Sequence, residues 1–248
     1  MNRPAKARLF GEVLPGLKAA RAYFSRPAIQ AAATAAGLEL KPGVLNVYLH
    51  QAVKQGLIHD AGRGWYSRLG EPVLLDVNLS SKLIRAVEKA FPLLGFTVWS
   101  TAQFNPWMHH LLARPVAFLY APRVTLDSVG EMLRDAGWEV TVNPGKRQAA
   151  KAVRPGEKMV VLRPVHSKQP SAIEHQAIPE QVVVELAMEA AALSLMAPDE
   201  AEAATGAMSE SGVLQIPVIQ RFAEYKKARL GWLDAINQRH FFEKSGDN

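Results

Sequence analysis

Prolines and glycines divide the first 70 residues into short segments, and this punctuation limits what the segment can fold into. Residues 5–22 have a helical pattern, but Pro15 cannot donate a backbone hydrogen bond, so we expect two short helices or a kink there. Ser25 is a good N-cap, and a proline follows near the first helical position. Together with Gly37, a typical helix-end residue, these signals predict a helix of small residues over 27–36.

A third helix is expected from Pro42 to about residue 55, where Gly56 ends it. Four apolar residues share one face of this helix at helical spacing: Leu45, Tyr48, Leu49 and Ala52. The chain then forms two short β segments around a glycine-rich turn at 61–64, which predicts a hairpin. The order helix, helix, turn, helix and hairpin predicts a winged helix-turn-helix domain.

The other face of the third helix carries polar side chains, and the hairpin carries basic ones. Such a helix can enter the major groove of DNA, while basic residues of a wing can reach phosphates. The candidate DNA-binding residues are Lys41, Asn46, Val47, His50 and Lys54, with Arg63 and Arg68 in the wing. Val47 would favour a thymine methyl group or contribute nothing specific. The alternatives are that this face contacts a protein or is only solvated.

Positive charge is concentrated in the same segment. Residues 1–70 contain ten Lys and Arg against three Asp and Glu, a net charge of +7. Residues 71–248 contain nineteen basic and twenty acidic residues, a net charge of −1. A polyanion is therefore attracted to the first segment, which favours double-stranded DNA as the partner.

Beyond a connector near residue 72, predicted strands alternate with predicted helices. The strands are expected at 95–100, 115–120, 138–142 and 158–162, and two or three helices follow residue 179. The predicted fold class is α+β: a winged-helix DNA-binding domain over 1–72, then a mixed α/β domain over 73–248 that ends in helices.

Two segments of the second domain have opposite charges. Residues 141–170 contain seven basic residues and one acidic residue, whereas residues 171–225 contain nine acidic residues and one basic residue. The basic segment could form a second phosphate-binding surface through Lys146, Arg147, Lys151 and Arg154. It could equally meet the acidic helices, within the chain or across a homodimer. The second option needs only proximity, and we slightly favour it.

The sequence lacks the residues and motifs that several classes of function require. The chain has no cysteine, which excludes disulfides, thiolate zinc sites, iron–sulfur clusters and cysteine nucleophiles. The pair His109-His110 is adjacent and cannot readily share one metal from a helix face, so we expect no metal site and no cofactor. Phosphate-loop, dinucleotide-binding and hydrolase motifs are missing, and we expect no catalytic residue. The start has no signal peptide and no apolar run reaches 18 residues, so we expect a soluble, cytoplasmic protein.

Two alternatives from other classes remain open. A nuclease would need paired carboxylates and a lysine on neighbouring strands, a role into which Asp127, Glu139 and Lys158 could be forced. A structural adaptor would use its basic and acidic segments for self-assembly.

Three stretches together resemble the antitoxins of AbiE-type (type IV) toxin–antitoxin pairs. The first is QGLIHDAGRGWYSRL at the end of the expected winged helix, and the second is the strand–helix–strand unit GFTVWSTAQFNPWMHHLLARPVAFLYA. The third runs from IPEQVVVELAMEAAALS to VLQIPVIQRFAEYKKAR. Where the family tends to carry an aspartate in a Leu-x-Asp-Leu-like helix, this chain has Glu185, to which we assign a structural role.

The resemblance implies an autorepressor that binds inverted repeats in its own promoter. It also implies a nucleotidyltransferase-like toxin as the partner, with antitoxicity residing in the C-terminal domain.

Overall fold

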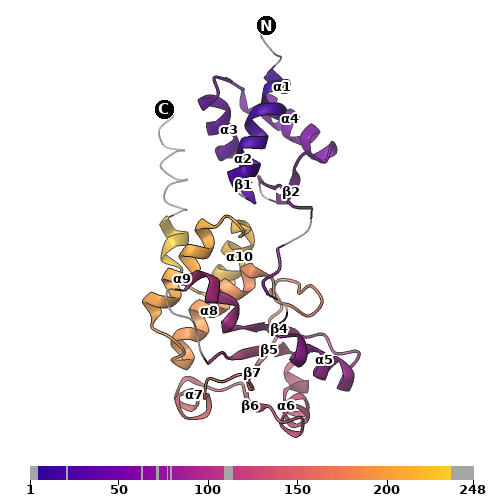
Figure 1. Cartoon of the computed structure of the whole chain (residues 1–248), viewed down its shortest axis with the longest axis vertical. Helices are drawn as coiled ribbons and strands as arrows, with labels where there is room; N and C mark the ends of the chain where they lie inside the picture. Colours follow the sequence, from indigo (N-terminus) through magenta and orange to yellow (C-terminus); the bar gives the residue numbers. More distant parts are fainter. Residues whose placement is uncertain are drawn as a thin grey trace. The chain divides into compact units, whose positions relative to one another are not determined.

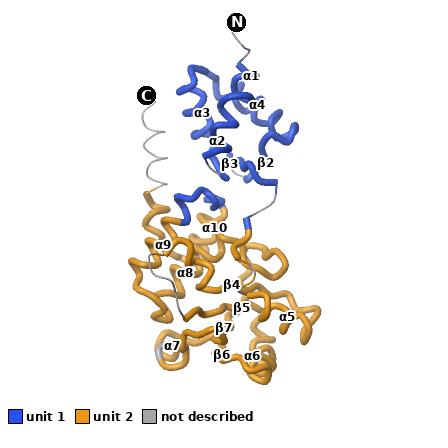
Figure 2. The backbone as a smooth tube through the Cα atoms, viewed as in Figure 1, with its two compact units in different colours: residues 1–73, 208–217 blue, residues 74–207, 218–248 orange. Residues whose placement is uncertain are grey.

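The computed structural model describes residues 5–20, 22–62, 64–70, 73–76, 78, 80–108 and 114–235 (Figure 1). The chain forms two compact units, coloured separately in Figure 2. The first contains Met1–Val73 and Met208–Pro217, and the second contains Leu74–Ala207 and Val218–Asn248.

The first unit begins with a continuous run of helical turns. It passes from α1 (Ala5–Arg8) through one π-helical turn, η1 (Leu9–Val13), into α2 (Leu14–Ala20). Neither a break nor a second capped helix occurs at Pro15. The wider π turn ends at Val13, two residues before the proline, and π turns and prolines are both places where a helix bends without ending.

Helices α3 (Arg26–Ala35) and α4 (Pro42–Lys54) follow where the sequence places them, each within one or two residues. The Ser25 hydroxyl accepts a hydrogen bond from the backbone N–H of Ala28, the expected N-cap contact. Gly37 and Gly56 have φ values of 73° and 68°, the left-handed conformation that ends a helix most easily at glycine.

A three-stranded antiparallel sheet completes the part of this unit that residues Met1–Val73 form. The predicted hairpin forms from β2 (His59–Gly62) and β3 (Trp65–Ser67), and β1 (Tyr23–Ser25) adds to the other edge of β3. Strand β1 is only three residues long and carries no alternation of apolar and polar residues. For this reason the sequence pattern did not reveal it.

The core of the first unit comes from η1, from helices α2, α3 and α4, from β1 and from the residue before β2. Its largest fully buried side chains are Leu9, Leu14, Phe24, Ile29, Leu45, Leu49 and Ile58. Apolar residues alternate with exposed ones at helical spacing on α4, so Leu45, Leu49 and Ala52 are buried while the opposite face is exposed.

A segment from late in the chain belongs to this first unit. The Tyr23 N–H donates to the Gly212 carbonyl oxygen at 3.2 Å, and the Gln215 side-chain amide donates to the Ala61 carbonyl oxygen. Residues 208–217 were expected within a second domain of residues 73–248. They instead lie against the sheet of the first unit, because they supply partners for backbone groups of β1 and β2.

The second unit is built on a four-stranded sheet with the order β4-β5-β7-β6. The strands are β4 (Thr97–Ser100), β5 (Ala117–Ala121), β6 (Glu139–Val142) and β7 (Met159–Pro164). β4 is antiparallel to β5, whereas β5, β7 and β6 run parallel to one another. All four strands were expected from the sequence, each within a few residues.

Helices cover both faces of this sheet (Figure 1). On one face, α5 (Ser81–Ala90) and α6 (Leu126–Asp135) pack onto alternate strand residues such as Val98, Leu119 and Leu162. On the other face lies α8 (Pro179–Leu193), with α7 (Lys146–Ala152) in contact with it. The connections through α6 and α7 run in opposite directions along the sheet, so a common handedness places them on opposite faces.

Two helices complete the second half of the chain: α9 (Pro198–Glu210) and α10 (Ile216–Lys226), which both reach into the segment 208–217. Two short 3₁₀ segments lie at the ends of β4 and β5, η2 (Thr101–Trp107) and η3 (Arg123–Thr125). An α-helix was expected between the two strands of the unit GFTVWSTAQFNPWMHHLLARPVAFLYA. The 3₁₀ form occurs instead over the described part, where Pro106 lies inside the turn and lacks a backbone donor.

The fold is therefore mixed α+β with two sheets, as the fold class predicted. Among the described residues, no helix is both long and apolar enough to cross a membrane.

Candidate functional site

The exposed face of α4 brings together five of the predicted DNA-binding residues. Lys41 precedes the helix at its N-cap, and Asn46, Val47, His50 and Lys54 follow along it, all exposed. Leu45 and Leu49 are fully buried on the opposite face and anchor the helix to the core. The polar face is therefore held outward by apolar packing, as the sequence pattern predicted.

The segment between α3 and α4 is held in place by side-chain hydrogen bonds to its carbonyl groups. The Arg8 guanidinium donates to the Ala36 carbonyl oxygen, and the Gln30 amide donates to that of Leu40 at 3.2 Å. Lys18 Nζ similarly donates to the Leu57 carbonyl oxygen at 2.8 Å, just after α4 ends. Both ends of α4 are thus tied to neighbouring helices, so its exposed face is presented on a rigid support.

The hairpin places Arg68 on the surface, directly after β3. Its backbone N–H donates to the Ala22 carbonyl oxygen at 3.0 Å, which ties this end of the hairpin to β1. Arg63, the other predicted wing residue, lies outside the described residues.

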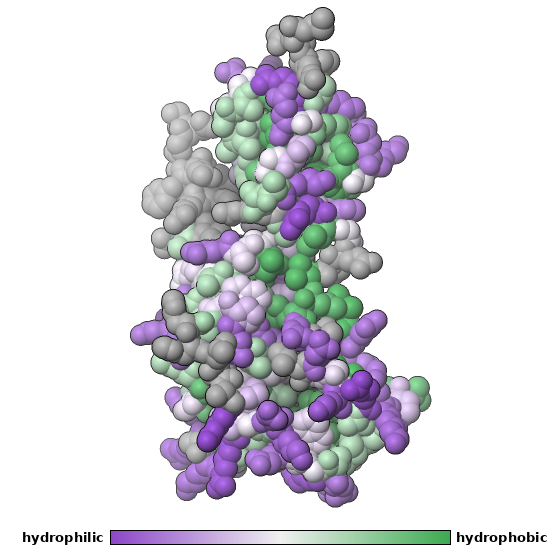
Figure 3. Space-filling view, in the orientation of Figure 1, coloured by the Kyte–Doolittle hydropathy of each residue, from purple (hydrophilic) through white to green (hydrophobic). Residues whose placement is uncertain are grey.

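The predicted second basic surface lies on and after α7. Lys146, Arg147, Lys151 and Arg154 are all exposed, and no ion pair joins any of them to a described acidic residue. Figure 3 shows that the lower end of the second unit, where α6 and α7 lie, is predominantly hydrophilic.

Within the chain, α8 does not offer an exposed acidic surface to the basic residues of α7, whereas Asp199 and Glu210 of α9 are exposed. Glu180, Glu185 and Glu189 of α8 are only 4 %, 0 % and 7 % exposed, because this helix is buried on nearly all sides. One described ion pair joins the two segments of opposite charge, between Arg163 and Glu189. Within the chain, the basic and acidic segments are thus joined by a buried ion pair from β7 to α8, and not by the exposed basic residues of α7.

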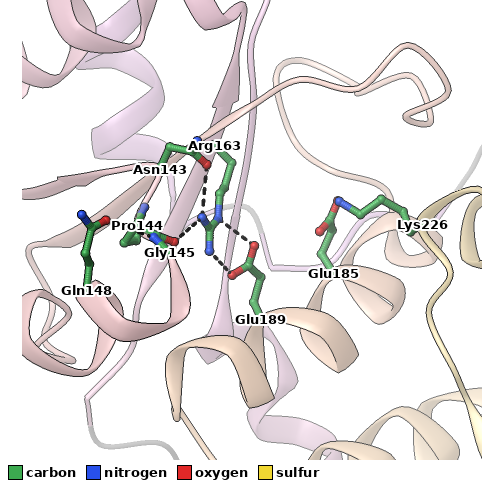
Figure 4. A network of polar contacts seen from close by, with 8 residues as sticks. All are labelled: Asn143, Pro144, Gly145, Gln148, Arg163, Glu185, Glu189 and Lys226. Carbon is green, nitrogen blue, oxygen red and sulfur yellow. Dashed lines mark hydrogen bonds and ion pairs between the residues drawn. The ribbon is translucent and has the colours of Figure 1, made fainter.

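A buried ionic cluster lies between the sheet and α8 (Figure 4). Arg163 projects from β7 and pairs with Glu189, while Lys226 at the end of α10 lies 3.1 Å from Glu185 Oε1. Gln181, Glu185 and Glu189 are spaced four residues apart, so they share one face of α8. Two cations and two carboxylates compensate one another there, as buried charges require.

Burial shifts the acid–base behaviour of this cluster. Removal from water raises the pKa of Glu185 above its usual value, and this effect outweighs the opposing charge of Lys226. Burial also raises the pKa of Tyr120 well above 10.0, with further increases from the charges of Glu185 and Glu189. The pKa of His166 is lowered by burial and then by the nearby Lys226.

Several polar atoms of the cluster have no hydrogen-bond partner among the described residues. They are Trp99 Nε1, Tyr120 Oη, both amide atoms of Gln181 and both carboxylate oxygens of Glu185. Glu185 is thus paired with Lys226 by charge rather than by a well-directed hydrogen bond. Buried groups of this kind are normally satisfied by ordered water, for which a polar interior is suitable.

The residues considered for a nuclease are not brought together. Asp127 lies near the start of α6, which follows the carboxyl end of β5 after η3, whereas Glu139 is the first residue of β6 and Lys158 directly precedes β7. A sheet of parallel strands separates those two ends. Within the described residues, no three His, Asp or Glu side chains form a group that could hold a metal ion. His109 and His110 lie outside those residues.

Sequence reasoning did not find the buried cluster. Its signal is the polar spacing of Gln181, Glu185 and Glu189 in an otherwise apolar helix, but the basic partners come from β7 and α10, far away in sequence. Net charge per segment concealed the cluster, because it counts buried and exposed carboxylates alike.

The fold and these surfaces define a two-unit α+β protein with an exposed polar helix on one unit and a buried ionic cluster in the other. The chain belongs to a family of unknown function, DUF6577, whose model matches residues 44–239. No curated protein and no solved structure gave a match.

Proposed function

We propose that this protein is a sequence-specific DNA-binding transcriptional regulator whose first unit is a winged helix-turn-helix domain. In this proposal α3 and α4 are the helix-turn-helix pair, α4 is the recognition helix and the β2–β3 hairpin is the wing. The observation that carries the proposal is the exposed face of α4, where Asn46, His50 and Lys54 project from a helix anchored on its other side.

The chemistry of that face suits the edges of base pairs. A major groove about 12 Å wide admits an α-helix, and an asparagine amide can bond both N6 and N7 of adenine. His50 offers a ring nitrogen to a base or a phosphate. Lys41 and Lys54 lie at the two ends of the helix, where a phosphate backbone passes beside a recognition helix.

The exposed basic residues of α7 add a second attraction for phosphate. Lys146, Arg147, Lys151 and Arg154 have no acidic partner in the described part of the chain, so they are available to a polyanion. We include them in the proposal as contacts that raise affinity without reading sequence.

The regulatory role follows from the resemblance to AbiE-type antitoxins. On that basis the protein represses its own promoter at inverted repeats as a homodimer, and acts as the antitoxin of a nucleotidyltransferase-like toxin. A nuclease remains without support, because its candidate residues lie at opposite ends of the sheet.

Fluorescence anisotropy with a duplex from the promoter upstream of this reading frame tests the proposal. We expect Asn46→Ala to reduce the preference for that duplex over unrelated DNA, and Lys54→Ala to weaken binding to both. Arg63→Ala should behave like Lys54→Ala. The matched control is Lys89→Ala, which removes an exposed lysine from α5 of the other unit.

Equal binding of promoter and unrelated DNA by the unmodified protein would contradict sequence-specific regulation. Binding that is insensitive to both salt and Lys54→Ala would contradict the phosphate contacts. Co-expression with the product of a neighbouring nucleotidyltransferase-like reading frame tests the antitoxin role, since growth should then depend on this protein.

A further inference from the structure

Two valines are exposed on the polar face of α4. Val44 is 40 % exposed and Val47 is 54 % exposed, while apolar residues on the other side of the same helix are fully buried. Val47 lies almost opposite the buried Leu45 and Leu49, at the centre of the exposed face, because α-helical residues advance by about 100° each. Neither valine is needed to close the core of the first unit.

Gly43 lies on the same exposed stripe, four residues before Val47. A methyl group added at Gly43 would meet nothing within 4 Å, and its φ is not in the left-handed region. Neither packing within the chain nor the backbone conformation therefore requires a glycine. Gly11 and Gly16, which also lie in helical turns, have as much free space, so we take from Gly43 only that this position in the first turn of α4 carries no side chain that would keep a partner at a distance.

From these three residues we infer that α4 reads thymine. In this inference, which rests on the proposed DNA-binding function, the methyl side chains of Val47 and Val44 contact C5-methyl groups in the major groove. Gly43 lets the first turn of the helix approach the base edges, the position from which recognition helices make their contacts. The bound sequence therefore contains thymine opposite this turn, beside an adenine contacted by Asn46.

A protein partner is the alternative occupant of this face. Charge complementarity favours DNA, because the valines are bordered by Lys54 and by Lys41 and lie in a segment with a net charge of +7. A docking surface for an apolar peptide would have a larger continuous apolar area than two valines provide.

The test replaces thymine by deoxyuridine, which removes the C5-methyl group and keeps the base pair. Binding sites are first selected by the full chain from a pool of random duplexes, and each thymine of the selected site is then replaced singly. We expect deoxyuridine to weaken binding about fourfold at one or two positions, from the loss of one buried methyl contact. Val47→Ala should bind the thymine and deoxyuridine duplexes equally at one of those positions.

Val124→Ala is the matched control, because Val124 is 90 % exposed and lies in η3 of the second unit. It should keep the full sensitivity to deoxyuridine. Thermal unfolding checks that Val47→Ala remains folded. We expect it to do so, because the Val47 side chain is exposed and leaves no cavity in the core when it is shortened.

The possible failures are distinguishable. If the unmodified protein selects no sequence, the proposed function fails and the inference fails with it. If it selects a sequence but deoxyuridine has no effect at any position, or Val47→Ala retains the effect, DNA binding stands and thymine reading is overturned.

Discussion

Arg163 pairs with both oxygens of the Glu189 carboxylate, with Nε 2.8 Å from Oε1 and Nη2 2.6 Å from Oε2 (Figure 4). The third nitrogen, Nη1, donates to the Pro144 carbonyl oxygen at 2.8 Å and to Asn143 Oδ1 at 3.3 Å. One planar guanidinium therefore connects β7 to α8 and to the turn before α7. A lysine could not reproduce this geometry, since it offers a single point charge.

Arg163→Lys should accordingly destabilise the second unit. Lysine would keep the charge but lose the two-point contact and the bonds to the turn, so we expect a loss of about 2 kcal/mol in the free energy of unfolding. Urea denaturation followed by circular dichroism measures this loss. The control Arg147→Lys, on the exposed face of α7, should stay within about 0.5 kcal/mol of the unmodified protein. Equal stability of the two variants would show that the paired geometry contributes nothing.

Lys226→Met should be destabilising at neutral pH and less so in mild acid. The substitution leaves the Glu185 carboxylate buried without its cation, at a cost of about 3 kcal/mol at pH 7. Burial already raises the pKa of Glu185 above 4.5, so the folded state binds this proton more tightly than the unfolded state. The stabilisation that comes from binding this proton is therefore complete below the pKa of Glu185 in the unfolded state. It is lost as pH rises through the higher pKa of Glu185 in the folded state.

The loss caused by Lys226→Met should thus shrink as pH falls towards 4.5, because a protonated Glu185 needs no counter-charge. Denaturation midpoints between about pH 4.5 and pH 8 measure this dependence. The double variant Lys226→Met with Glu185→Gln should recover most of the stability at pH 7 and lose the pH dependence. A loss that is constant with pH would contradict the assigned pairing.

Local signals predicted most of the helices and strands, and the failures have a common cause. Ser25, Gly37 and Gly56 act on their own neighbours, so α3 and α4 could be predicted from the chain alone. Strand β1 and the segment 208–217 depend on partners distant in sequence, to which short-range patterns are insensitive. Ser80 shows the same limit: it occupies the N-cap position of α5, but its hydroxyl donates to Gln176 Oε1 at 2.8 Å instead of capping the helix.

The same limit applies to the candidate sites. Helical spacing separated the exposed residues of α4 from the buried ones, because that division is local. The pairing of Arg163 with Glu189 could not be predicted, since it needs the packing of α8 on the sheet. What the exposed residues contact is decided by a partner and stays a prediction.

Gly43→Ala should change stability and DNA binding in opposite directions. Alanine favours the helix and meets no neighbour, so we expect the free energy of unfolding to rise by about 0.5 kcal/mol. The added methyl group would stand between the first turn of α4 and the base edges, so affinity for DNA should fall about tenfold. Thermal unfolding and anisotropy measure the two quantities. A variant that is both more stable and unchanged in affinity would show that nothing approaches Gly43 closely.

Replacing the four exposed basic residues of the second unit by alanine should lower the salt dependence of DNA binding. Each phosphate contact contributes about 0.9 to the slope of log K against log salt. The variant with alanine at 146, 147, 151 and 154 should therefore lose up to about 3.6 from that slope while keeping its sequence preference. Anisotropy titrations at several salt concentrations provide the slopes. An unchanged slope would confine the DNA contacts to the first unit.

A fragment of residues 1–73 should be less stable than the same fragment joined to residues 208–217. The Tyr23 N–H and the Ala61 carbonyl group lose their partners in the shorter fragment, at a cost of about 2 kcal/mol for two hydrogen bonds. Joining residues 208–217 to the fragment through a flexible linker should restore this lost free energy of unfolding. Urea denaturation measures it. A linker followed by a scrambled version of 208–217 is the control, and equal stability of all three proteins would contradict the role of this segment.

The contribution of residues 208–217 also bears on how the protein is made. The ribosome synthesises the helices and the hairpin of the first unit early, yet the partners of Tyr23 and Ala61, which are Gly212 and Gln215, are added only towards the end of the 248 residues. At about 5–20 residues per second, that delay lasts on the order of ten seconds or more. Throughout this time the nascent first unit lacks the contacts at Tyr23 and Ala61, so chains that terminate early carry an incomplete version of it.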